Sequence, residues 1–184
     1  IQTAMQNGNR IVFHQSEPSR WKEAQERMGR YTVGAMFRIL LPEILSDVSR
    51  IIYLDADVLV YRDIKELWDM DLQDYCLAAV PDYPTVNGMG KPYPVAKGDV
   101  LPSCYFNSGV LCMNLERIRM QGSMYENVMK YLIANPKASL PDQDALNVIY
   151  GTETYLLDGT WNTFATSIWT HPETPMENRI YHFA

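Results

Sequence analysis

The stretch Arg50-Ile51-Ile52-Tyr53-Leu54-Asp55-Ala56-Asp57-Val58-Leu59-Val60 decides the fold of this chain. It is apolar and rich in β-branched residues, and it contains neither Pro nor Gly, which predicts a buried β-strand. Two carboxylates interrupt the apolar run. Because residues two apart in an extended chain point to the same side, we expect Asp55 and Asp57 to project together.

The paired carboxylates need a compensating charge. Two ionised carboxylates at this spacing repel each other, and burial strengthens the repulsion. A divalent cation would relieve it, so the pattern indicates a metal site. The alternative is a pair of solvated residues at a strand end or in a turn. The apolar residues on both sides of the pair argue against that alternative.

The composition is that of a single acidic globular domain. The chain has 184 residues, 47% of them hydrophobic, and a net charge of −6 at pH 7, which allows one domain with a sizeable core. Lys and Arg are scattered, which argues against a nucleic-acid surface. No apolar run reaches the roughly eighteen residues of a membrane span. Cys76 and Cys112 lie in apolar runs as expected for core residues, which favours a reducing interior.

Strand-like and helical patterns alternate along the chain. This alternation predicts an α/β fold with a largely parallel sheet flanked by helices. A helix is expected from Thr32 to Leu41, stopped at Pro42. The Pro- and Gly-rich stretch 83–103 is expected to be a lid or an acceptor-side loop. The other predicted strands are 10–14, 75–80, 105–114, 154–157 and 180–183, and the other predicted helices are 21–28, 63–68, 124–134 and 139–149.

Polar residues follow two of the predicted strands. Asp82 comes just past the strand that ends at Val80. Asp57 occupies the same kind of position, and ligands of open α/β sheets gather beyond the carboxyl ends of strands. Asn107 precedes a buried strand and offers both a donor and an acceptor, while Gly109 permits close backbone approach. The residues alone favour a binding role and a simple turn equally.

Four further residues allow two interpretations each. Asp142 suits the first turn of a helix because of the helix dipole, but Gln143 beside it is harder to explain by capping. Arg38 lies in an apolar stretch, where it would make a structural ion pair or reach an anionic ligand. His182, in the last strand-like run, is either a core histidine or a third metal ligand.

Taken together and in order, these pieces resemble the family 8 retaining glycosyltransferases, which include bacterial lipopolysaccharide glucosyl- and galactosyltransferases and glycogenin. The resemblance implies a GT-A fold, Rossmann-like and mainly parallel, as one catalytic domain over residues 1–184. It covers nearly the whole chain. The matching pieces are Phe37–Pro42, Tyr53–Val60, Ala79–Asp82, Tyr105–Val110, Asp142–Asn147, Trp161–Asn162 and His182–Phe183.

The resemblance also implies an activity and a site. It implies a metal-dependent hexosyltransferase that moves glucose or galactose from a UDP-sugar to a glycan or lipopolysaccharide-type acceptor. In that family an Asp-X-Asp pair and a late His hold Mn²⁺, with Mg²⁺ as the alternative ion; the matching residues here are Asp55, Asp57 and His182. An imidazole among carboxylates suits Mn²⁺. The implied substrate-binding residues are Arg38, Asp55, Ala56, Asp82, Asn107, Ser108, Asp142 and Gln143, with Asp142 and Gln143 as the catalytic pair.

Retention of configuration leaves two routes. One passes through a covalent intermediate on an enzyme nucleophile. In the other, the acceptor attacks from the side of the leaving group through an oxocarbenium-like state. Because an amide oxygen is a poor nucleophile, we favour attack from the leaving-group side, with the Gln143 carbonyl oxygen stabilising positive charge.

The resemblance is incomplete at both ends of the chain. The family's first β-α unit, which binds the nucleobase, has no counterpart here, nor does a Gly and a Lys-Pro-Trp that follow the late His. We therefore expect a segment of a longer enzyme, with weak donor binding and poor turnover by itself. The family implies a cytoplasmic enzyme, with peripheral association at the inner face of a bacterial membrane where the acceptor is lipid-linked. Oligomeric state has no signature in the sequence.

Two other functions share some of these features. Haloacid-dehalogenase phosphatases also place Asp-X-Asp after an apolar strand, but they require a later acidic pair that we do not find. That function would leave Asn107, Gln143 and His182 unexplained. The second alternative is a catalytically weak module that binds a nucleotide sugar.

Overall fold

The computed structural model describes residues 8–15, 33–82, 104–165 and 177–184. The predicted helix 21–28, the expected cap at Thr32 and the loop 83–103 lie outside these residues. The helical elements are η1 (Val33–Met36), α3 (Phe37–Ile44), α4 (Lys65–Trp68), α6 (Leu115–Met120), α7 (Met124–Ala134), α8 (Pro141–Tyr150), η3 (Gly151–Glu153) and η4 (Gly159–Trp161). The strands are β1 (Arg50–Leu54), β2 (Val58–Val60), β3 (Leu77–Pro81), β4 (Phe106–Asn114), β5 (Thr154–Leu156), β6 (Thr163–Phe164) and β7 (Ile180–His182).

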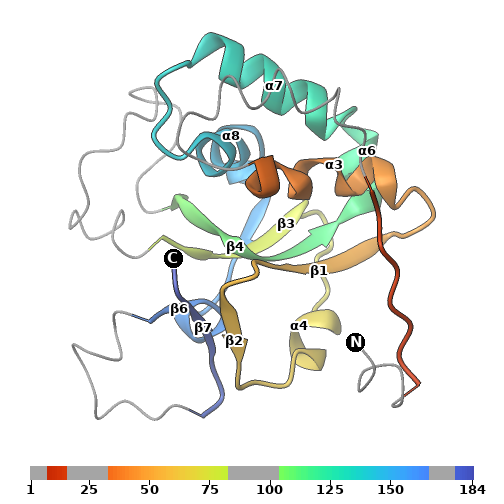
Figure 1. Ribbon diagram of the computed structural model, residues 1–184, viewed down its shortest axis with the longest axis vertical. Coiled ribbons are helices and arrows are strands. Elements are labelled where there is room, and N and C mark those ends of the chain that lie inside the picture. The colour runs from red at the N-terminus through yellow and green to blue at the C-terminus, as the bar shows by residue number, and fades with distance from the viewer. Residues whose placement is uncertain (1–7, 16–32, 83–103, 166–176) are drawn as a thin grey trace.

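The elements form three layers (Figure 1). Helices α3, α6, α7 and α8 lie on one face of a four-stranded sheet with the order β1-β4-β3-β5. Helix α4 and a three-stranded sheet with the order β2-β7-β6 lie on the other side. No helix among the described residues is both long enough and apolar enough to cross a membrane.

The central strands β3 and β4 are buried on both faces. Because successive side chains of a strand point to opposite faces, Leu111 and Met113 pack against the helical layer, whereas Val110 and Cys112 pack toward α4 and η4. The side chains of β3 alternate between the same two sides of the sheet. Burial on both faces explains why both strands read as continuous apolar runs. It also confirms the expectation that Cys76 and Cys112 are core residues.

The expectation of a mainly parallel sheet is wrong for the described strands. β4 runs antiparallel to both of its neighbours, β1 and β3, and only β3 and β5 are parallel in the large sheet. In the small sheet, β7 is antiparallel to β2 and parallel to β6. The alternation of strands and helices gives the order of the elements along the chain but does not determine which strands are neighbours. β4 lies between β1 and β3 and is antiparallel to both.

Three local predictions are also wrong. The stretch Arg50–Val60 is two strands in different sheets, and most of it is only half-buried. Helix α3 continues through Pro42, because packing of its buried residues retains the helix despite the missing N–H. The stretch Arg10–His14 forms no strand, since no described strand pairs with it, and Phe13 is exposed. By contrast, α7 coincides with the predicted helix Met124–Ala134.

Candidate metal and sugar site

The two aspartates of the Asp-X-Asp motif lie on a turn between β1 and β2. The Asp55 N–H donates to the Gly109 carbonyl at 2.8 Å, and the Phe183 N–H donates to the Asp57 carbonyl at 3.0 Å. The carboxylates therefore converge because the chain turns, and the extended geometry that we predicted is wrong. The two aspartates lie at a strand end, as in the alternative of solvated strand-end or turn residues, and the Asp57 side chain is 52% exposed.

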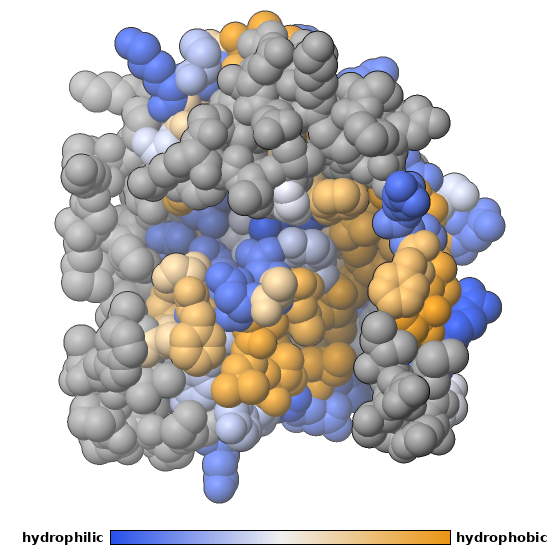
Figure 2. Space-filling view, viewed as in Figure 1, coloured by the Kyte–Doolittle hydropathy of each residue, from blue (hydrophilic) through white to orange (hydrophobic). Residues whose placement is uncertain are grey.

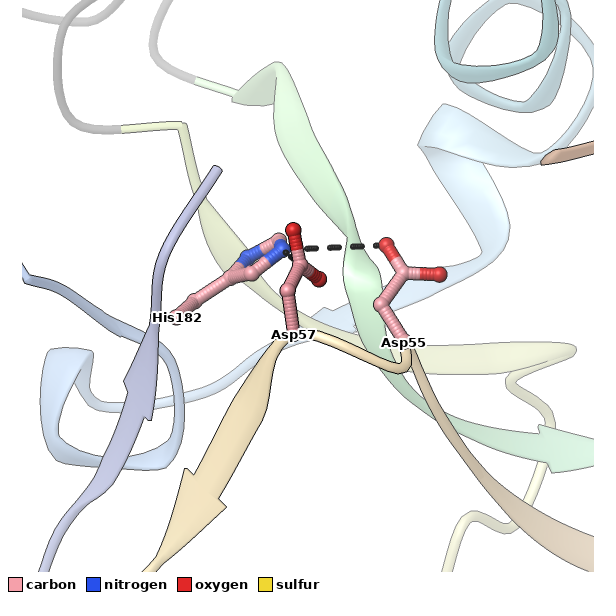
Figure 3. A group of neighbouring side chains, drawn as sticks. All are labelled: Asp55, Asp57 and His182. Atoms are coloured by element: carbon pink, nitrogen blue, oxygen red, sulfur yellow. Dashed lines mark ion pairs between the residues drawn. The ribbon is translucent and has the colours of Figure 1, made fainter. Parts of the chain in front are cut away.

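Strand pairing brings His182 to this turn from the far end of the chain. β7 pairs with β2 so that His182 is opposite Val58, next to Asp57. The imidazole Nε2 lies 3.3 Å from Asp57 Oδ1 and 3.7 Å from Asp55 Oδ2 (Figure 3). One ligand atom from each of the three residues lies within 4.8 Å of the other two. The structure thus joins the three predicted metal ligands.

The imidazole of His182 is enclosed on its other sides. It lies over the backbone of Gly109, so closely that a Cβ there would be 2.1 Å from His182 Cε1. The Phe164 ring is nearly parallel to it, with centroids 6.0 Å apart. Nδ1 lies 3.1 Å from Asn162 Oδ1. These contacts hold the ring edge that carries Nε2 toward the two carboxylates.

Arg38 orients the carboxylate of Asp55. Its Nη2 lies 2.8 Å from Asp55 Oδ1, and its Nε lies 3.5 Å from Asp142 Oδ2. The guanidinium also donates to the Ser108 carbonyl and lies 4.6 Å from the centroid of the Tyr53 ring, whose hydroxyl donates to Asp55 Oδ1. Because Oδ1 receives both donors, Oδ2 faces His182. The described contacts of Arg38 include a buried ion pair, and contact with an anionic ligand stays a prediction for this residue, which also lines the cavity.

A second cluster of polar side chains lies beside the metal ligands. The Gln143 amide NH₂ donates to Asp82 Oδ2 at 3.2 Å and to the Tyr105 hydroxyl at 3.3 Å. The Gln143 carbonyl oxygen accepts from the Ser108 N–H at 3.0 Å and from Asn107 Nδ2 at 3.2 Å. A backbone N–H can only donate, so this contact establishes which end of the Gln143 amide is the oxygen.

Burial changes the acidity of the acids at the start of α8. Removal from water raises the pKa of Asp142, although the Arg38 guanidinium opposes the shift. Burial also raises the pKa of Asp144, against a hydrogen bond from the Tyr105 hydroxyl. Asp142 therefore combines a confined carboxyl group with an adjacent cation, which is typical of functional acids.

One cavity of about 380 Å³ joins the two clusters, a size within the usual range for small-ligand sites. In the view of Figure 2, polar residues gather in a hollow where β1 gives way to β2. Of the predicted site residues, only Ala56 is missing from the lining, because it points to solvent at the exposed turn. The lining includes the predicted residues Arg38, Asp55, Asp57, Asp82, Asn107, Ser108, Asp142, Gln143 and His182.

The structure adds three residues that sequence reasoning did not assign to the site: Tyr53, Asn162 and Tyr105. Each contacts a predicted residue: Tyr53 holds Asp55, Asn162 holds His182, and Tyr105 holds Gln143. Their residue types carry no signal of their own. The Trp161-Asn162 pair was part of the family resemblance, but its role depends on long-range contacts that no local pattern encodes.

Comparisons with known proteins agree with this fold. The family profile described as Glycosyl transferase family 8 matches residues 2–184. General stress protein A of Bacillus subtilis (strain 168) is 32% identical over 88% of this chain and 56% of its own length. Glucoside xylosyltransferase 2 of Mus musculus is 30% identical over 83% of this chain and 36% of its own length. This chain thus spans about half or less of these relatives.

The solved structures give the same result for the fold. The crystal structure of galactosyltransferase LgtC in complex with donor and acceptor sugar analogues superposes with a TM-score of 0.73. The likeness covers 96% of this chain and 67% of LgtC at 24% identity. The architecture is therefore the GT-A fold of glycosyltransferases. From the family profile, the chain belongs to glycosyl transferase family 8, which leaves the phosphatase interpretation without support.

Proposed function

We propose that this chain is the catalytic part of a metal-dependent retaining hexosyltransferase that transfers glucose or galactose from a UDP-sugar to a glycan acceptor. The observation that carries the proposal is that one cavity holds both the Asp55–Asp57–His182 group and the hydrogen-bonded Asp82–Gln143 cluster. Membership of family 8 supports the reaction class. The names of two relatives, a glucoside xylosyltransferase and a galactosyltransferase, support a sugar donor.

The three ligand atoms fit a divalent cation of intermediate hardness. Asp55 and Asp57 each offer a carboxylate oxygen and His182 offers Nε2; this mixture suits Mn²⁺ better than Mg²⁺, which prefers an all-oxygen shell. When bound, the metal would supply Lewis-acid stabilisation of the negative charge that develops on the departing diphosphate. The protein's contribution is orientation, because Arg38 and Tyr53 hold one oxygen of Asp55 and leave the other toward the site.

The Asp82–Asn107–Gln143 cluster is suited to bind sugar hydroxyls. Its members pair with one another inside the cavity wall, so their side chains are already oriented before a sugar arrives. Preorganised donors and acceptors avoid the cost of reorganisation on binding. Asp82 offers a carboxylate that can accept from sugar hydroxyl groups, and the Asn107 amide, whose NH₂ group lies 3.4 Å from Asp82 Oδ2, helps to orient it.

The structure suggests a different distribution of catalytic roles from the one expected from sequence. The Gln143 carbonyl oxygen already accepts from Ser108 and Asn107, which occupies its two lone pairs. We assign Gln143 to hold Asp82 and Asn107 in place. We assign Asp142 to supply negative charge at the cavity wall: its Oδ2 lies 3.5 Å from Arg38 Nε, and this cation opposes the rise in the pKa of Asp142 that burial causes. A carboxylate in this position stabilises an oxocarbenium-like state better than an amide does.

Retention follows if the acceptor hydroxyl attacks from the side on which the diphosphate departs. The bond from the anomeric carbon to the phosphate oxygen breaks, the bond to the acceptor oxygen forms, and the acceptor's proton passes to the departing phosphate oxygen. The competing route is attack by Asp142 to form a glycosyl–enzyme ester. Rapid quenching followed by mass spectrometry separates the routes, because an adduct on Asp142 contradicts attack from the leaving-group side.

We further propose that the acceptor is a glycan or lipid-linked glycan of the lipopolysaccharide type, met by a cytoplasmic enzyme at the inner face of a bacterial membrane. The deciding experiment measures UDP released from UDP-glucose and UDP-galactose with Mn²⁺, with and without glycan acceptors. We expect release to depend on metal and to be lost in Asp57→Asn and His182→Ala, but not in the exposed control Asp47→Asn. Because we expect poor turnover by this chain alone, the test is made at saturating donor, and measurable release that is equal for all four proteins would refute the proposal.

A further inference from the structure

The orientation of the Asn162 side chain follows from an anchor in the backbone. The Gly109 N–H lies 2.9 Å from Asn107 Oδ1, and because a backbone N–H can only donate, that atom is an oxygen. The Asn162 atom that lies 2.7 Å from the same oxygen must then be the NH₂ group. Both asparagine side chains are buried, Asn162 at 2% exposure and Asn107 at 7% in the cavity wall.

The same chain of contacts sets the protonation of the imidazole. With its NH₂ group directed to Asn107, Asn162 presents its carbonyl oxygen to His182 Nδ1 at 3.1 Å. A carbonyl oxygen only accepts, so Nδ1 carries a proton in this contact. Nε2 is the ring nitrogen left toward Asp57 at 3.3 Å and Asp55 at 3.7 Å, where it can donate its electron pair to a metal ion. Three electron-pair donors directed at one point are arranged for a cation.

We propose that Asn162 is a positioning residue that fixes the tautomer and ring orientation of His182 for metal binding. Through Asn107, which also contacts Asp82 and Gln143, it links the orientation of the metal ligand to the sugar-side cluster. The proposal rests on the proposed function in one respect: the Asp55–Asp57–His182 group holds a divalent cation. Outer partners of a metal-bound His usually affect metal affinity by about 10–100-fold.

Two substitutions of similar size separate the two bonds of Asn162. Asn162→Asp keeps an oxygen that accepts from Nδ1 but cannot donate to Asn107; Asn162→Leu loses both bonds. We expect Asn162→Leu to weaken Mn²⁺ binding by about 10–100-fold and Asn162→Asp to weaken it less, because the acceptor for Nδ1 remains although its second oxygen faces the oxygen of Asn107. Mn²⁺ affinity is read from the electron paramagnetic resonance signal of the free ion. Thr154→Val, which loses a buried hydrogen bond to Tyr150 away from the site, controls for a general loss of stability.

A second measurement needs no metal. Long-range ¹H–¹⁵N spectra of the metal-free protein at pH 8 report the tautomer of each histidine, and the His182→Ala variant assigns the signal. We expect Nδ1 of His182 to carry a proton in wild type and Asn162→Asp, whether or not Nε2 also carries one toward Asp57, and to lose it in part in Asn162→Leu. If Nδ1 carries this proton in wild type but the protein binds no Mn²⁺, the proposed metal site fails while the hydrogen bond from His182 to Asn162 stands. A wild-type ring without a proton on Nδ1, or Mn²⁺ binding that is equally tight in Asn162→Leu and wild type, overturns the inference.

Discussion

Gly109→Ala is expected to destroy the metal site by displacing one side chain. A Cβ at this position would lie 2.1 Å from His182 Cε1, 2.7 Å from Nδ1 and 2.8 Å from Nε2. All three nearest atoms belong to the imidazole, and ordinary contact begins at 3.4 Å. The ring must therefore move by roughly 1.3 Å or more, whereas a metal site tolerates only about 0.2 Å in its ligand distances.

The magnitude follows from these displacements. Loss of the His182 ligand should reduce Mn²⁺ affinity by at least about 100-fold, since loss of an outer partner alone costs about 10–100-fold. Overpacking of the buried site should cost about 1–3 kcal/mol, which lowers the Tm of a protein of this size by about 2–12 °C. Mn²⁺ titration and thermal unfolding of the metal-free protein measure the two effects.

Two comparisons make this prediction specific. Gly159→Ala is the matched control, because a Cβ at Gly159 meets nothing within 4 Å, and we expect no change in metal affinity. In a His182→Ala background the added methyl has no ring to displace, so Gly109→Ala should then cost little further stability, and the double-mutant cycle should show coupling. Additive losses, or wild-type Mn²⁺ affinity in Gly109→Ala, would contradict the reasoning.

Three further predictions concern the ionisable groups. Arg38→Met leaves Asp142 buried without its cation, so we expect a loss of about 3–5 kcal/mol in urea unfolding; an unchanged midpoint would show that the ion pair is dispensable. Burial raises the pKa of Asp142 above its usual 3.8, so the folded state binds this proton more tightly than the unfolded state does. We therefore compare the unfolding free energies of metal-free wild type and Asp142→Asn. The difference, wild type minus variant, should fall as the pH rises above about 4, by at most about 1.4 kcal/mol per pH unit. A difference that rises with pH would contradict the raised pKa of Asp142. Burial also raises the pKa of the Cys76 thiol to about 12 and that of Cys112, so a disulfide reagent should modify the half-exposed Cys104 first, and equal rates for all three thiols would be inconsistent with this burial.

The sequence predicted most elements and named the three candidate metal ligands that the structure brings together, but not the geometry that joins them. The apolar runs of β3 and β4 and the stripe of α7 are local signals, and they appear where the patterns placed them. The position of β4 between two antiparallel neighbours is not local, because strand order depends on which faces can be covered by helices. No periodicity of residues 50–60 reveals a turn at the motif itself.

The contacts between distant residues were the least predictable part of the site. Gly109 was expected to allow close backbone approach, and the structure shows that the group that approaches is the His182 ring. The hydrogen bond from Asn162 to Asn107 joins the residue that follows η4 to a residue of β4, and no local sequence pattern predicts it. The arginine at position 38 was ambiguous because its partners, Asp55 and Asp142, come from separate parts of the chain.

The central claim is that one cation binds between the turn after β1 and the imidazole on β7. Anomalous diffraction at the manganese edge, from crystals grown with Mn²⁺ and UDP, tests it most directly. We predict a single strong peak within coordination distance of Asp55, Asp57 and His182, with the UDP diphosphate on its open side. A manganese peak that contacts neither carboxylate, or one that leaves His182 outside its coordination shell, would contradict the account.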